Sequence, residues 1–215
     1  MSWPRISKKI AKQFELITGA IHEASHTIYA LLHYMKVESV CVFEDKKLKR
    51  IHGATYYDFP VDIELVEDQS IINCLVRSDV GMSYSGLIAE KILFKSLSGL
   101  SQTPMFIRDG STDDNKDARE MIAKYNLAAA GQKRSAYKRK LMREVQLELT
   151  AYWNDIVLIS HNLIKRRKLN YTDLQMLLTK KSINKVFWKE HFKGLNNIFN
   201  SETLDENVLR IKLLG

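Results

Sequence analysis

The chain has 215 residues, of which 45% are hydrophobic and 27% charged, and its formal net charge is +8. This length and composition suit one globular domain, or one domain with a small extension. No apolar run approaches the roughly 18 residues of a membrane span, and the start lacks the apolar region of a signal peptide, so we expect a cytoplasmic protein. Cys41 and Cys74 have no CxxC spacing and are predicted to be buried free thiols.

The first predicted element is a helix over about residues 8–35, where apolar residues recur every three or four positions. It contains the HExxH pattern His22-Glu23-Ala24-Ser25-His26. Histidines four residues apart project side by side, so His22 and His26 can hold one zinc ion while Glu23 acts on its water as general base. The pattern is short, and the alternative interpretation is a half-buried helix with two hydrogen-bonded histidines.

The following segments are predicted from residue type and spacing. Runs rich in β-branched or aromatic residues indicate a pair of strands, 37–43 and 53–58. Helical spacing indicates helices over 70–78, 84–97, 113–125, 133–167 and 172–178, the fourth as one long helix or two in line. Gly81 and Gly86 allow either close helix packing or a break, and Asn170 and Thr172 offer a turn and an N-cap.

The positive charge is concentrated in two basic runs. They contain Lys133, Arg134, Lys138, Arg139, Lys140, Arg143, Lys165, Arg166, Arg167 and Lys168. Such runs are typical of solvated helix faces, and they also suit an acidic partner, nucleic acid or an anionic membrane surface. No DNA-binding motif or aromatic platform accompanies them, so we do not expect nucleic-acid binding.

A third metal ligand must come from outside the pair of histidines. A metzincin would have glycine and histidine three and six residues after His26, where this chain has Tyr29 and Leu32. His33 lies about 10 Å further along a straight helix and is too distant. His52 and the carboxylates remain candidates. The densest carboxylate group is Asp109, Asp113, Asp114 and Asp117. Aspartates also favour helix starts for capping alone.

Four segments occur in an order that resembles a known family. They are His22–His26, the strand pair 37–43 and 53–58, Gly86–Phe94, and Gly110–Asp114 followed by Ala118. Together they resemble the proteolytic domain of the FtsH-type zinc metalloproteases, over about residues 14–178. The resemblance implies a mainly α protein with a small β-sheet (α+β), a zincin-like helical domain over 1–178, and a helical extension over 179–215.

The resemblance also implies roles for single residues. His22, His26 and Asp114 would bind one Zn²⁺, and Glu23 would be the catalytic base. Thr55, Tyr56 and Tyr57 would lie on the strand that binds substrate. Ser25 stands where the family usually has glycine, Asp113 where it often has asparagine, and Asn115 where it has leucine.

The implied activity is that of a zinc endopeptidase acting on unfolded or loosely structured polypeptides. The sequence lacks a GxxxxGK[ST] phosphate loop, so we expect no ATPase module and either ATP-independent cleavage or a separately encoded ATPase partner. Because the family assembles as rings, a homo-oligomer is compatible with the resemblance, as is a monomer. The alternative is a non-catalytic zinc-binding adaptor that uses the basic helices and the aromatic C-terminal extension to bind a partner.

Overall fold

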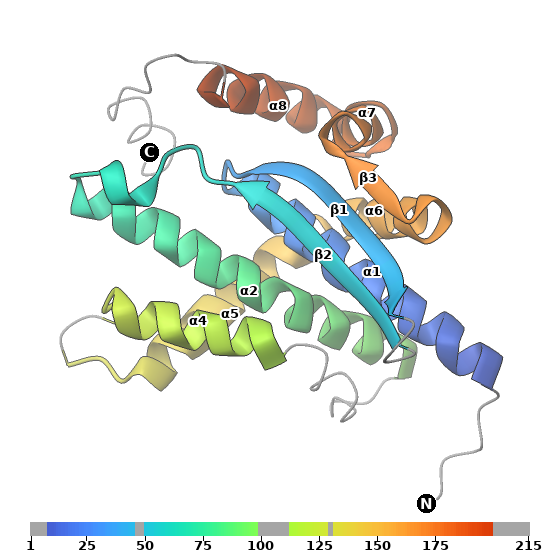
Figure 1. Cartoon of the computed structure of the whole chain (residues 1–215), viewed down its shortest axis with the longest axis horizontal. Coiled ribbons are helices and arrows are strands. Elements are labelled where there is room, and N and C mark those ends of the chain that lie inside the picture. The colour runs from blue at the N-terminus through green and yellow to red at the C-terminus, as the bar shows by residue number, and fades with distance from the viewer. Residues whose placement is uncertain (1–7, 46–49, 99–111, 129–130, 200–215) are drawn as a thin grey trace, which may run out of the picture.

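The computed structural model describes residues 8–45, 50–98, 112–128 and 131–199. Their elements, in chain order, are α1 (Lys8–Leu32), β1 (Lys36–Asp45), β2 (Arg50–Asp58), the 3-10 helix η1 (Ile63–Leu65), α2 (Gln69–Ser98), α4 (Thr112–Lys124), α5 (Arg134–Ala151), α6 (Trp153–Arg166), β3 (Lys168–Asn170), α7 (Tyr171–Lys181) and α8 (Lys185–Phe199). Helices dominate and the sheet is small (Figure 1). The predicted α+β class is therefore confirmed.

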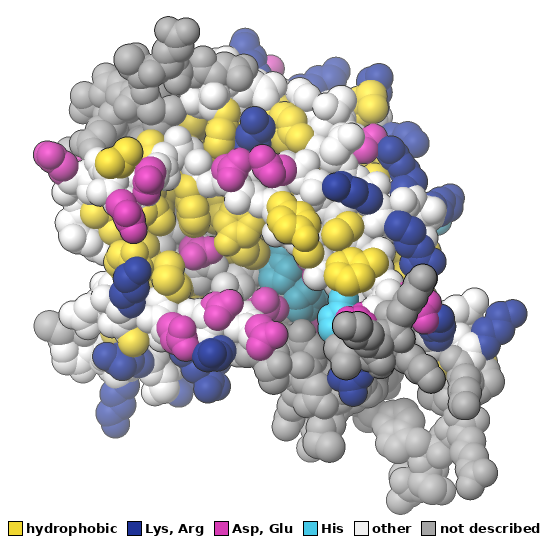
Figure 2. Space-filling view, viewed as in Figure 1, with side chains coloured by type: hydrophobic (Ala, Val, Ile, Leu, Met, Phe, Trp, Pro, Cys, Tyr) yellow, Lys and Arg dark blue, Asp and Glu magenta, His cyan; other side chains and the backbone are white. Residues whose placement is uncertain are grey.

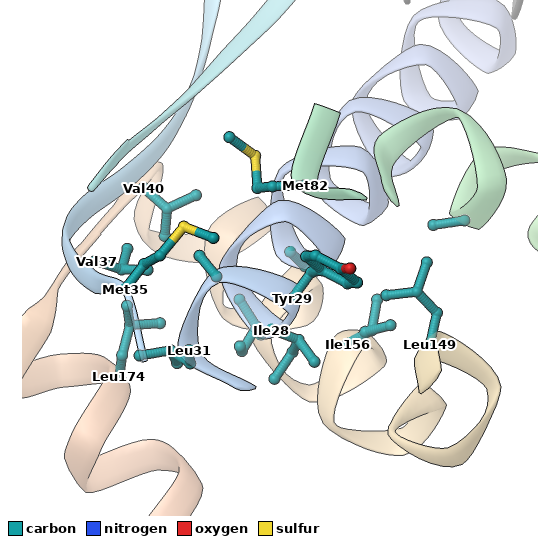
Figure 3. Packing of buried hydrophobic residues seen from close by; sticks show 14 of the residues in the cluster. Ile28, Tyr29, Leu31, Met35, Val37, Val40, Met82, Leu149, Ile156 and Leu174 are labelled. Atoms are coloured by element: carbon teal, nitrogen blue, oxygen red, sulfur yellow. The ribbon is translucent and has the colours of Figure 1, made fainter. Parts of the chain in front are cut away.

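Helix α1 runs through the centre of the core. Every residue from Ala20 to Leu31 is buried, and the helix packs against α2, α6 and both long strands (Figure 1). Figure 3 shows Ile28 and Tyr29 of this helix in the same hydrophobic cluster as Leu149 of α5 and Ile156 of α6. A helix surrounded in this way can bury polar side chains only if each finds a hydrogen-bond partner. The polar residues of α1 therefore mark positions where neighbouring elements supply partners.

The sheet has the order β2-β1-β3, with both pairs antiparallel. Strand β1 is central and packs on α1 through Val37, Val40 and Val42, which are buried. Both predicted strands are present. The three-residue strand β3 was not predicted, because so short a pairing leaves no periodic pattern in the sequence. In the order β2-β1-β3, strand β2 forms one edge of the sheet.

Helix α2 is continuous through Gly81 and Gly86, the two glycines that allowed either close packing or a break. A Cβ at Gly81 would lie 2.1 Å from the Tyr29 hydroxyl oxygen, and one at Gly86 would lie 2.4 Å from Nε2 of His22. Both glycines therefore permit close packing of α2 on α1. The helical stretches predicted over 70–78 and 84–97 are both present in α2, and of the two alternatives for the glycines the structure shows close packing and no break.

The segment predicted as one long helix or two in line is two helices, α5 and α6, which meet at Tyr152. After β3, the predicted N-cap at Asn170 is confirmed. Its side chain accepts a hydrogen bond from the backbone of Asp173 at 2.8 Å, and the Asp173 carboxylate accepts one from the Asn170 N–H at 3.1 Å. Such a reciprocal capping box fixes the start of α7.

Helix α8 belongs to the same hydrophobic core as α1. Trp188 and Phe192 are buried in it, and the His191 ring bonds the Leu31 carbonyl oxygen through Nε2 at 2.6 Å. The buried Asp155 of α6 accepts hydrogen bonds from Ser182, Asn184 and Trp188. The loop before α8 and the helix itself are thus attached to α6 by one carboxylate.

Two further sequence expectations can be compared with the structure. Cys41 and Cys74 are free thiols as predicted, but both are half-buried, so the prediction that they are buried is wrong. The basic runs lie at exposed positions as expected, except for Lys138, which is half-buried. None of the helices in the described ranges has the length and apolar character to cross a membrane.

Candidate metal centre

Three side chains from two helices converge beside the buried half of α1. His22 and His26 project from α1, and Asp114 lies in the first turn of α4. Oxygen Oδ2 of Asp114 is 3.1 Å from Nε2 of His22 and 3.7 Å from Nε2 of His26. One ligand atom from each residue lies within 4.8 Å of the others, and no other group of this kind was found in the described ranges. The cluster can hold a metal ion.

The other ring nitrogens fix the orientation of both imidazoles. Nδ1 of His22 is 2.7 Å from Oε1 of Glu90, and Nδ1 of His26 is 2.8 Å from the carbonyl oxygen of Met82. A carbonyl oxygen can only accept, so Nδ1 of His26 carries the proton, and in the neutral ring Nε2 presents a lone pair. This is the metal-binding tautomer of His26, and the Nε2 atoms of both histidines face Asp114.

The charges at the centre favour a cation between these atoms. Burial alone would raise the pKa of Asp114, but hydrogen bonds with His22 and His26 outweigh it and hold the pKa well below its usual range. Asp114 is therefore ionised, and its oxygen faces Nε2 of both imidazoles. A carboxylate oxygen and an imidazole nitrogen can face each other only with a proton or a metal ion between them. Two imidazoles and one carboxylate form a donor set that suits zinc and related divalent ions.

Glu90 is a site residue to which the sequence analysis gave no role. Its carboxylate is 5% exposed and holds the His22 ring through Oε1, while Oε2 is buried without a hydrogen-bond partner. Gly86 and Glu90 are four residues apart on α2, so they share the face that contacts His22. The sequence did contain one indication of this role, namely a glutamate on the apolar side of a helix, one turn after a glycine.

Glu23 lies between His22 and His26 in sequence and contacts β2 in space. Its side chain is 6% exposed, and Oε2 accepts a hydrogen bond from the Thr55 hydroxyl at 2.8 Å. Strand β2 passes so close that a Cβ at Gly53 would lie 2.5 Å from Oε1 of Glu23. The carboxylate that the sequence identified as a base is therefore enclosed by α1 and β2.

Ser25, at the position where the FtsH-type proteases usually have glycine, is fully buried. Its hydroxyl donates to the carbonyl oxygen of His22 at 2.7 Å, within the same helix. The hydroxyl is thus satisfied locally and does not reach the surface.

The three predicted substrate-strand residues have different surroundings. Thr55 contacts Glu23, as described. Tyr57 donates its hydroxyl to Oδ1 of Asp79 at 2.6 Å, and burial together with that carboxylate raises the pKa of Tyr57. Tyr56 is 54% exposed. Their role in binding substrate stays a prediction.

The other residues considered as third ligands do not join the cluster. His52 stacks on Phe43, with ring centroids 6.2 Å apart, while Asp113 and Asp117 are exposed on α4. Asp109 lies outside the described residues. Figure 2 shows histidine side chains recessed between a band of hydrophobic side chains and a row of acidic ones. By comparison with Figure 1, the band lies on the β2 side and the acidic row lies over α4.

No protein-family model matches the chain, and no curated protein sequence matches it either.

Proposed function

We propose that this protein is a zinc-dependent endopeptidase related to the proteolytic domain of the FtsH-type metalloproteases. The observation that carries the proposal is the convergence of His22, His26 and Asp114 beside Glu23. Three protein ligands leave one coordination position open for water or substrate, which is the arrangement of catalytic rather than structural zinc sites. The HExxH pattern places a carboxylate next to that position.

The residues divide the chemistry between them. When bound, zinc would lower the pKa of water to about 7 and polarise the scissile carbonyl group. His22, His26 and Asp114 would hold the ion, and Glu90 and the Met82 carbonyl orient the two imidazoles. A carboxylate oxygen of Glu23 accepts the proton of the attacking water and passes it to the leaving amine. This proton transfer is the step that the chain itself performs.

Within the described ranges no strand pairs with the outer edge of β2, and this edge supports binding of an extended polypeptide. The N–H of Val42 bonds to Arg167 on the β3 side, so the backbone groups of its partner Gly53 face away from β1. By the two-residue period of a strand, those of Thr55 do the same. An unfolded chain can add to this edge through backbone hydrogen bonds, directly beside Glu23. The substrate class is therefore unfolded or loosely structured polypeptide.

The first experiment compares cleavage of a denatured protein, without ATP, by the zinc-loaded wild type and the Glu23→Gln variant. Positioned general bases are typically worth about 10² to 10⁴ in rate, so Glu23→Gln removes nearly all turnover while one zinc per chain remains bound. Glu15→Gln is the matched control, since Glu15 lies on the same helix and the amide oxygen of glutamine can still accept the hydrogen bond from the Ile51 N–H. It retains wild-type turnover.

The outcomes separate the two candidate activities. Cleavage by the wild type and by Glu15→Gln, together with its loss in Glu23→Gln, supports the peptidase. Zinc bound by all three proteins without cleavage, even when a purified AAA ATPase from the same cell is added, contradicts it and favours the zinc-binding adaptor.

A second experiment tests strand addition at β2. Peptide substrates carry a single backbone N-methyl group at successive positions around the scissile bond. Because only alternate residues of an added strand bond to β2, cleavage falls at every second position. Equal cleavage of all the methylated peptides would exclude this mode of binding.

A further inference from the structure

The geometry points to a positioning role for Thr55 and Gly53, which together hold the Glu23 carboxylate: Thr55 binds its Oε2 and the backbone at Gly53 packs against its side chain. This inference rests on the proposed peptidase activity and assigns two residues to the placement of its base. Thr55 would then act on the reaction through Glu23 rather than through substrate.

The position of Glu23 depends first on the similar spacing of the residues of α1 and β2 that face each other. Four residues of a helix rise about 6 Å and two residues of a strand about 6.7 Å, so steps of four on α1 can face steps of two on β2. The facing residues are Glu15, Gly19 and Glu23 on the helix and Ile51, Gly53 and Thr55 on the strand. The Ile51 N–H donates to Oε1 of Glu15 at 3.2 Å, and a Cβ at Gly19 would lie 3.3 Å from the Ile51 side chain. The strand is therefore in fixed register with the helix before it reaches Glu23.

Thr55 holds the carboxylate by its hydroxyl group. Its Oγ1 is 2.8 Å from Oε2 of Glu23 and 3.3 Å from the carbonyl oxygen of the same residue. The hydroxyl has one proton, and the shorter contact to the charged acceptor is the stronger one. Thr55 pairs with Val40, a buried residue of β1, so the backbone that carries the hydroxyl is anchored in the core.

Gly53 provides the space that the carboxylate occupies. A Cβ there would lie 2.2 Å from Cγ, 2.5 Å from Oε1 and 2.6 Å from Cδ of Glu23. Any side chain at this position would displace either the carboxylate or the strand. The backbone of β2 thus passes against one side of the carboxylate while Thr55 binds one of its oxygens. The Glu23 side chain, which has several rotatable bonds, is thereby restricted to one arrangement. A general base needs such a restriction to stay within reach of the proton that it accepts.

A purely structural role would give different results from a positioning role. In the structural role, Thr55 only satisfies a buried carboxylate, and its loss lowers stability without a specific effect on the chemical step. In the positioning role, loss of the hydroxyl lowers kcat while KM and zinc content stay the same. Small displacements of a catalytic group cost up to about 100-fold in rate.

The test uses Thr55→Val, Thr55→Ser and the control Thr18→Val in the zinc-loaded full chain. Thr18 is a buried α1 threonine whose hydroxyl bonds the Phe14 carbonyl oxygen. Thr55→Val lowers kcat about 10- to 100-fold, with KM within about twofold and one zinc per chain, whereas Thr55→Ser recovers most of the rate. Thr18→Val keeps wild-type kcat. A Thr55→Val enzyme with wild-type kcat overturns the inference alone, whereas a wild type without Glu23-dependent cleavage overturns the proposed function and this inference with it.

A second measurement needs neither zinc nor activity. Urea unfolding of the metal-free wild type, Thr55→Val, Glu23→Ala and the double variant forms a double-mutant cycle. If the hydroxyl binds the carboxylate, the double variant lowers the unfolding midpoint by less than the sum of the two single changes. Additive shifts would show that the two side chains do not interact and would overturn the inference.

Discussion

The contact between Glu90 and His22 leads to a prediction about metal affinity. The Oε1 to Nδ1 distance of 2.7 Å is that of a charge-assisted hydrogen bond, and both side chains are buried. Groups that orient a metal-binding histidine typically contribute 10- to 100-fold in affinity. Glu90→Gln keeps an acceptor and loses the charge, so we expect about 10-fold weaker zinc binding, or about 1.4 kcal/mol. Glu90→Ala removes the acceptor as well, and we expect about 100-fold.

The assay is competition for zinc with a chromophoric chelator at neutral pH. Glu148→Gln is the matched control, because Oε2 of Glu148 is 2.9 Å from Nε2 of His33, a histidine outside the metal cluster. This variant binds zinc as the wild type does. Wild-type affinity in Glu90→Ala would refute the reasoning, since it would show that the His22 ring keeps its orientation without the carboxylate.

Two further predictions concern stability. Asp155→Ala leaves three donors without their acceptor, so urea unfolding shows a loss of at least about 3 kcal/mol, whereas the exposed Asp58→Ala stays within about 0.5 kcal/mol of wild type; a loss below 1 kcal/mol at about neutral pH would contradict this. Burial alone would lower the pKa of His22, but hydrogen bonds to Asp114 and Glu90 raise it well above 6.5. Its stabilisation is therefore complete below pH 6.5 and lost as pH rises through the raised pKa. We therefore expect the urea midpoint of the metal-free protein to decrease as the pH is raised above 6.5, and to decrease less in Asp114→Asn. A urea midpoint that instead increases with pH by the same amount in both proteins would be inconsistent with this linkage.

The fold was predictable where one element carries a periodic pattern of its own. The apolar spacing of α1, the β-branched run of β1 and the cap at Asn170 are local signals, and each matches the structure. The pattern left two alternatives open at α2, because Gly81 and Gly86 interrupt the apolar series for contacts with Tyr29 and His22 on another helix. Nothing local distinguishes such a glycine from one that ends a helix.

The same limit applies to the candidate metal centre. HExxH is contiguous, so His22, Glu23 and His26 were visible in the sequence. Asp114 was reached only through the family resemblance, because spacing alone left His52 and several aspartates as candidates. The roles of Glu90 and Gly53 depend on the approach of α2 and β2 to α1, and periodicity contains no information about that distance.

The attachment of α8 to α1 has a consequence for the order in which the chain becomes active. His22 and Asp114 are 92 residues apart, and the contact between Leu31 and His191 spans 160 residues. Contacts between such distant segments form late, after the entropy of closing the intervening chain has been overcome. During synthesis, α1 emerges from the ribosome long before α4 and α8 can pack on it. Under the proposed peptidase activity, a copy still being synthesised would therefore not yet have the centre that cuts unfolded polypeptide.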